Sequence, residues 1–96
     1  MTVDLFSPVT MGRLTLPNRI VMAPLTRNRA AAGGVPQARN DEYYRQRASA
    51  GLIISEASPI SPRGIGYPGT PCMYNAAQVA GWCEVVAAVH AEGGHI

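Results

Sequence analysis

The sequence predicts an α/β fold in which parallel strands alternate with helices. Two short apolar runs, residues 19–23 and 52–57, have the character of strands buried on both faces of a parallel sheet. Each run is followed by a segment with helix signals, over residues 40–48 and 76–92. Strands and helices that alternate in this way form parallel sheets with right-handed crossovers.

A β-hairpin is expected before the first of these strands. Residues 9–11 and 14–16 alternate in polarity about a turn that contains Gly12. A glycine between two such runs is typical of a hairpin. Pro17 then ends the second arm.

The first helix is expected to open at Asn40, with Asn40 as the N-cap and two acidic residues in the first turn. Gly51 ends this segment. A polar, glycine-bearing loop over residues 27–39 leads into it. A longer loop, residues 58–74, follows the second strand, and a connection of that length is typically functional or disordered.

The second helix is expected to begin after an N-cap at Asn75 and to end at Gly93 and Gly94. Its apolar residues recur at the spacing i, i+3, i+4, i+7, which predicts the stripe that a surface helix turns towards a core. The stripe consists of Ala76, Val79, Ala80, Cys83, Val86, Ala87 and His90.

Two strands, with the start of a third at residues 95–96, cannot cover both faces of a parallel sheet. The alternation is that of a (β/α)8 TIM barrel, which holds eight such units in about 250 residues. We therefore expect residues 1–96 to be the N-terminal part of one barrel domain, preceded by the hairpin. The remaining part of the barrel would be a second chain or part of a longer parent protein.

The composition narrows the class of protein. All eight basic residues are arginines, and they are scattered rather than clustered, which argues against a nucleic-acid role. The two cysteines fit neither a metal motif nor a disulfide framework, and we expect both thiols to be buried or half-buried. Without a visible signal peptide or an apolar stretch of about 18 residues, a soluble cytoplasmic protein is the expectation.

Active sites of α/β barrels lie at the carboxyl ends of the strands, and two residues occupy such positions here. Thr26 offers a hydroxyl after the first strand, and Ala57 leaves room for a flat ligand after the second. Both have ordinary alternatives, a cap or turn residue for Thr26 and a packing residue for Ala57. Tyr67, in the long loop, either caps a pocket or anchors the loop.

Other side chains are assigned more modest roles. Glu56 ends an apolar strand and needs a partner; an arginine near the strand ends is favoured over a role as a catalytic acid. Tyr43, Tyr44 and Trp82 are expected to pack in the core. His90 is expected at the surface of the second helix, or partly buried there.

Several segments together resemble the opening of the old yellow enzyme family, most of all its bacterial alkene and N-ethylmaleimide reductases. The most specific is Asn-Arg-Ile-Val-Met-Ala-Pro-Leu-Thr-Arg, at residues 18–27. The other matching segments are residues 5–8, 42–48, 51–57 and 89–94.

The resemblance implies an FMN-bearing (β/α)8 barrel that uses NADPH or NADH to reduce activated alkenes such as enones and maleimides. It also implies roles for individual residues. Thr26 would hydrogen-bond the flavin ring and tune its electronics, and Tyr67 would line the substrate pocket. The backbone contacts to the flavin would come from Ala23, Pro24, Leu25 and Ala57.

In the family, the groups that clamp the substrate, donate the proton and hold the phosphate come later in the chain. We therefore expect residues 1–96 alone to be inactive, and activity to require the rest of the barrel. The alternative is a non-catalytic truncated or structural fragment with no activity of its own.

Overall fold

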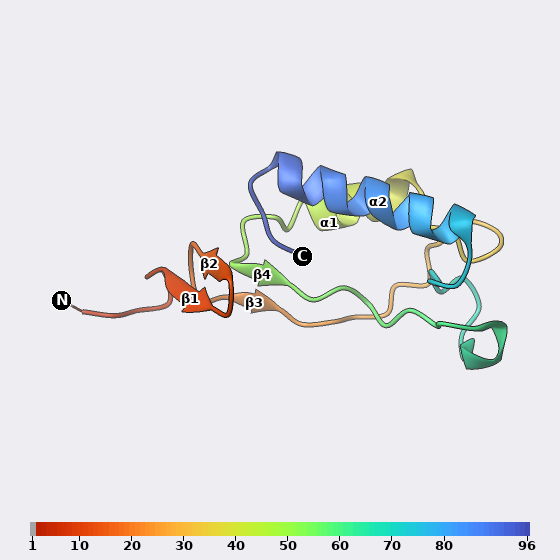
Figure 1. Ribbon diagram of the computed structural model, residues 1–96, viewed down its shortest axis with the longest axis horizontal. Coiled ribbons are helices and arrows are strands. Elements are labelled where there is room, and N and C mark those ends of the chain that lie inside the picture. Colours follow the sequence, from red (N-terminus) through yellow and green to blue (C-terminus); the bar gives the residue numbers. More distant parts are fainter. Residues whose placement is uncertain (1) are drawn as a thin grey trace.

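The structure, a computed structural model, describes residues 2–96 of the chain. These residues form an elongated body of 50 × 23 × 21 Å. Short strands and extended chain make one layer, and two helices lie side by side on one face of it (Figure 1). The N-terminal hairpin occupies one end of the body, and a short 3₁₀ helix, η1 (Pro62–Gly64), lies at the other.

The predicted hairpin is present. Strand β1 (Val9–Met11) pairs in antiparallel register with β2 (Leu14–Leu16), and Val9 lies opposite Leu16. Gly12 adopts a φ of 59° in the turn, a left-handed conformation that glycine reaches without a steric penalty. The hairpin is therefore specified by its own local sequence.

Strand β3 (Val21–Met22) pairs in parallel with β4 (Leu52–Ile53), as the alternation of elements predicts. The regular strands are shorter than the apolar runs, and both chains continue beyond them as extended segments that run side by side (Figure 1). Burial on both faces is not reached within the described residues, where Val21 is 42% exposed and Ile54 46%. This agrees with the expectation that two strands alone cannot be covered on both faces. Among the described residues, the two helices cover only one face of the layer.

The C-terminal residues lie beside β4. The backbone N–H of Ile53 donates to the carbonyl of His95 at 2.8 Å, whereas the N–H of Ile54 donates to Met22 at 3.0 Å. Successive N–H groups of a strand point to opposite edges, so His95 borders β4 on the edge away from β3. This is the position that a third parallel strand would take.

Helix α1 spans Ala38–Arg45 and begins two residues earlier than expected. Its N-cap is Gln37, and the prediction of Asn40 as the cap was wrong. Asn40 instead stands in the first turn, where its side-chain oxygen accepts a hydrogen bond from the backbone N–H of Gln37 at 2.8 Å. Asn40 thus stabilises the start of α1 as a residue of the first turn, by accepting from the N–H of the N-cap residue, and not as the N-cap itself.

Helix α2 (Ala76–Ala91) has the expected N-cap, because the Asn75 side chain accepts a hydrogen bond from the N–H of Gln78 at 2.9 Å. The expected buried stripe, however, is wrong. The core-facing residues are Trp82, Val85 and Val89, whereas Val79 is 47% exposed. Cys83 and His90 also lie at the surface. Apolar residues occupy almost every side of α2, so their spacing alone could not select the packed face.

The core lies between the two helices and β4. It contains two of the three aromatic residues expected to pack there, Tyr44 and Trp82, at 1% and 6% exposure. The third, Tyr43, is partly buried and packs against the core. The other buried members are Ala48, Ile53, Val85 and Val89. Helix α2 approaches the segment before α1 closely at Gly81, where a Cβ would lie 2.8 Å from the Pro36 ring and from its carbonyl oxygen.

Neither helix of the described region has both the length and the apolar character that crossing a bilayer demands.

Candidate functional site

A hollow of about 280 Å³ opens where the extended segments that follow β3 and β4 meet the long loop. It brings together Thr26, Ala57 and Tyr67, which come from three separate parts of the sequence. Ser58, Pro59, Gly64, Gly66 and Thr70 complete its lining. The hollow thus lies beyond the carboxyl ends of the parallel strands, where α/β barrels carry their sites.

The stretch that leads from β3 to Thr26 lies at the surface. Ala23, Pro24 and Leu25 are all exposed, Leu25 by 54%. They do not line the hollow itself, but they run up to it through Thr26. Pro24 has no N–H to contribute to a sheet, which lets the backbone leave the regular ladder at this point.

The long loop is held in place by hydrogen bonds. Thr70 Oγ1 lies 3.2 Å from Asn28 Oδ1 and 3.1 Å from the carbonyl of Tyr67, and Ala30 N–H donates to the carbonyl of Gly69 at 2.9 Å. These contacts tie the Tyr67 end of the loop to the segment that follows Thr26. The Tyr67 side chain remains 63% exposed beside the hollow.

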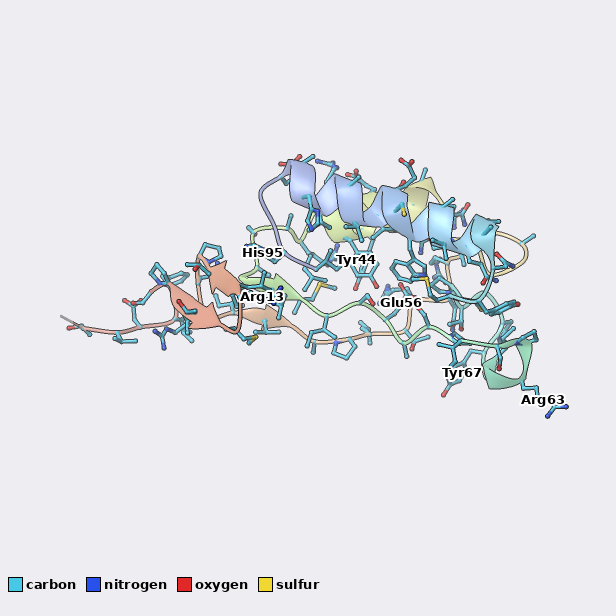
Figure 2. The ribbon with its side chains drawn as sticks, viewed as in Figure 1. Arg13, Tyr44, Glu56, Arg63, Tyr67 and His95 are labelled. Atoms are coloured by element: carbon cyan, nitrogen blue, oxygen red, sulfur yellow. The ribbon has the colours of Figure 1, made fainter. Side chains whose placement is uncertain are left out.

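Glu56 occupies the layer between this hollow and the core, and only 2% of it is exposed. Its carboxylate accepts hydrogen bonds from the Tyr44 hydroxyl at 2.8 Å and from the backbone N–H of Arg27 at 3.3 Å. Figure 2 shows Tyr44 reaching from α1 towards Glu56. We expected an arginine side chain as the partner of Glu56, and this expectation was wrong. Arg27 does contact Glu56, but through its backbone N–H and not through its guanidinium group.

The Tyr44 hydroxyl is held in its neutral form. Burial raises its pKa above the ordinary value of about 10, and the Glu56 carboxylate adds to the shift. A neutral phenol can donate to the carboxylate while it accepts the Glu56 backbone N–H at 2.9 Å. Tyr44 thus satisfies both groups of Glu56 at once.

A larger hollow, about 600 Å³, lies at the opposite ends of the strands. It is lined by Asn18 and Ile20, which precede β3, and by Ser49 and Ala50, which precede β4. In α/β barrels this amino-terminal end serves stability rather than chemistry. We therefore place the candidate site at the smaller hollow beside Thr26.

The outer face of α2 is apolar and uncovered. A shallow hollow of about 400 Å³ runs along it, lined by Met73, Val79, Trp82, Cys83, Val86, Ala87 and His90. Cys83 is exposed here, contrary to expectation, whereas Cys72 is buried as expected. We refer to the five α2 residues of this lining other than the core residue Trp82 as the outer α2 face: Val79, Cys83, Val86, Ala87 and His90.

Comparison with known proteins decides the family. A family model described as NADH:flavin oxidoreductase / NADH oxidase matches residues 4–96, nearly the whole chain. The chain belongs to this family. The resemblance of residues 18–27 and the other segments to old yellow enzymes is thereby confirmed.

Individual members of the family are similar throughout the chain. Chanoclavine-I aldehyde reductase of Penicillium roqueforti is 51% identical over 94 residues, which are 96% of this chain and 26% of that protein. The structure of morphinone reductase in complex with tetrahydroNAD matches at 56% identity and a TM-score of 0.92, over 97% of this chain and 25% of its own. The old yellow enzyme homologue from Zymomonas mobilis matches at 52% identity and a TM-score of 0.92, over 96% and 26%.

The chain therefore spans about a quarter of the length of these family members. They are (β/α)8 barrels, and the chain has the α/β fold of the first part of such a barrel, with the hairpin in front. This confirms the fold class that the alternation of strands and helices predicts.

Sequence reasoning missed the hydrogen bonds that hold this site together. The pairing of Tyr44 with Glu56 spans 12 residues, and the contact of Glu56 with the N–H of Arg27 spans 29. The charge of Glu56 in an apolar strand signalled that a partner was needed. No local pattern identifies a partner that is a phenol on a helix or a main-chain amide.

Proposed function

We propose that this chain forms part of an FMN-dependent ene-reductase and supplies one wall of its flavin site. One observation carries the proposal: Thr26, Ala57 and Tyr67 surround a single hollow at the carboxyl ends of two parallel strands. Membership of a flavin oxidoreductase family supports the same reading. Residues 1–96 would be the incomplete N-terminal part of one FMN-binding barrel domain.

The residues at the hollow fit one side of a flat aromatic ring. Ala57 has only a methyl group, and the exposed backbone of residues 23–25 offers polar groups along an edge. Ligand pockets usually enclose about 300–1,000 Å³. The hollow, at about 280 Å³ and open, fits one face of the cofactor rather than the whole of it.

Bound FMN would supply the hydride chemistry that links NADPH or NADH to an activated alkene, such as an enone or a maleimide. Thr26 would hydrogen-bond the ring through its hydroxyl and so tune its electronics. Ala23, Pro24, Leu25 and Ala57 would offer main-chain contacts along the ring. Tyr67 would border the space for the alkene. Morphinone reductase, solved with tetrahydroNAD, supports a nicotinamide as the reductant.

The rest of the barrel, as a second chain or as part of a longer protein, would complete the site. Two features of the strand layer support this. The described helices cover only one of its faces (Figure 1), whereas a parallel sheet needs both faces covered. The edge of β4 beside His95 carries no regular strand among the described residues. The outer α2 face is apolar and uncovered as well.

The test compares the chain alone with the chain joined to the remaining strands of a barrel, for example those of a relative. The joined protein should be yellow and should oxidise NADPH in the presence of N-ethylmaleimide, with free FMN as the control. The chain alone should not be yellow, because it supplies only one wall of the flavin site. It should not oxidise NADPH either, because it lacks the well-oriented groups that contribute about 7–11 kcal/mol to such a reaction. A joined, folded protein that binds no FMN would contradict the proposal.

A further inference from the structure

The Glu56 carboxylate is buried without a cation. Only 2% of the residue is exposed, and the ion pairs of the described residues all involve Arg45 rather than Glu56. Two neutral donors hold the carboxylate instead, the Tyr44 hydroxyl on Oε2 and the Arg27 backbone N–H on Oε1. A buried charge is costly unless it is well hydrogen-bonded, so its position next to the candidate site requires an explanation.

The two oxygens connect different parts of the molecule. Through Oε2, Glu56 is fixed to helix α1, and through Oε1 it reaches across to the segment that follows β3. Arg27 follows Thr26 directly, and Glu56 precedes Ala57 directly. One side chain therefore joins the two segments in which the adjacent residues, Thr26 and Ala57, line the hollow.

The geometry of a peptide bond makes this contact consequential for Thr26. The unit between Thr26 and Arg27 is planar, so an N–H that points at Glu56 restricts the orientation of the whole unit. This constrains the ψ angle of Thr26 and, with it, the direction in which the Thr26 side chain leaves the backbone. Residues 23–29 are all exposed, so packing does little to fix the Thr26 side chain. The contact of the Arg27 N–H with Glu56 adjoins Thr26 directly.

We propose that Glu56 is a positioning residue: through the N–H of Arg27 it sets the orientation of Thr26 towards the flavin. The inference rests on the proposed function, since it takes the flavin as the group that Thr26 contacts. Tyr44 supports Glu56 from the opposite side. Glu56 itself does not touch the cofactor or the substrate.

A purely structural role for Glu56, tying α1 to the strand layer, makes a different prediction. In that case, removal of the carboxylate lowers stability and leaves the bound flavin unchanged. Tyr44→Phe is the matched comparison, because it breaks the tie to α1 but keeps the carboxylate and its contact with Arg27.

The experiment uses the assembled flavoprotein and the variants Glu56→Ala, Glu56→Asp, Tyr44→Phe and Thr26→Ala. Glu56→Ala removes the oxygen that accepts from the Arg27 N–H. Glu56→Asp keeps the charge but is one methylene shorter, so it withdraws from the Arg27 N–H without removing a negative charge near the flavin. It also serves if Glu56→Ala fails to fold. The readouts are the midpoint potential of the bound FMN and the rate of amide hydrogen exchange at Arg27.

We expect Glu56→Ala and Glu56→Asp to shift the potential in the same direction as Thr26→Ala and to raise amide exchange at Arg27 by about tenfold, as the loss of one hydrogen bond implies. Tyr44→Phe should change both readouts much less. In a Thr26→Ala background, Glu56→Asp should have no further effect on the potential, because coupled residues are not additive.

Two results would overturn the inference alone. One is an unchanged potential and unchanged exchange at Arg27 in both Glu56 variants. The other is a shift of the FMN potential by Glu56→Asp that persists in the Thr26→Ala background. Such a shift would show that Glu56 does not act on the flavin through Thr26. If Thr26→Ala itself leaves the potential unchanged, or if no FMN binds, the proposed function fails, and the positioning role fails with it.

Discussion

The Tyr44 hydroxyl lies 2.8 Å from Oε2 of Glu56 and 2.9 Å from the backbone nitrogen of the same residue. One phenol on α1 therefore satisfies both a buried carboxylate and a buried main-chain N–H. This pair joins α1 to the strand layer directly beside Ala57 of the candidate site. Loss of the pair should therefore lower the free energy of unfolding.

Replacement of Tyr44 by phenylalanine should destabilise the assembled protein by about 1–3 kcal/mol, because it leaves two buried groups without their partner. Tyr43→Phe is the matched control. The Tyr43 ring packs under the guanidinium groups of Arg27 and Arg47. A phenylalanine at this position keeps the ring and therefore keeps that packing. Chemical denaturation of both variants measures the difference; equal stability of the two would contradict the role of the Tyr44 hydroxyl.

Stability should fall at alkaline pH through the same residue. The pKa of Tyr44 is raised in the folded state, so its contribution is complete below the unfolded value of about 10 and is lost as the pH rises above it. Unfolding followed between pH 9 and pH 12 should show a steeper decline for the native sequence than for Tyr44→Phe. Parallel pH profiles would show that Tyr44 ionises normally in the folded protein.

The contact of α2 with Pro36 should make Gly81 intolerant of a side chain. Alanine is the better helix former by about 1 kcal/mol, but its Cβ would lie 2.8 Å from the Pro36 ring and carbonyl oxygen. Overpacking of this kind typically costs about 1–3 kcal/mol, so we expect a net loss of stability in Gly81→Ala. Gly66→Ala, where nothing lies within 4 Å, should be close to neutral in the same thermal melts.

Much of the fold could be predicted from local signals. Gly12 marks the hairpin turn and Asn75 the start of α2, and each acts within a few residues of its own position. The parallel pairing of β3 with β4 follows from the alternation of elements. The site positions of Thr26 and Ala57 follow in turn from where those strands end.

The remainder depends on tertiary contacts that local patterns do not contain. Asn40 has the character of a cap, yet it acts from the first turn because the helix starts after Gln37. The packed face of α2 is set by the fit of Trp82 and Val85 against α1 and β4, not by the spacing of its apolar residues. The partner of Glu56 is likewise chosen by the fold.

The two cysteines should report on the assembly of the barrel. Cys72 is 1% exposed, whereas Cys83 lies on the outer α2 face. The isolated chain should show no cooperative melt, since so small a core contributes only about 3–5 kcal/mol, and both thiols should then react rapidly with a thiol reagent. In the assembled protein both should be protected, Cys83 by the neighbouring part of the barrel. A Cys83 that stays reactive after assembly would contradict the covering of that face.

The central claim is that Thr26 faces the flavin, and the midpoint potential of bound FMN tests it most directly. Thr26→Ala should shift the potential and alter the balance of the two half-reactions while FMN stays bound, because the ring loses a hydrogen bond that tunes its electronics. Thr15→Ala, on the exposed hairpin strand β2, should leave both unchanged. A Thr26→Ala protein with the native potential and native half-reaction rates would contradict the account.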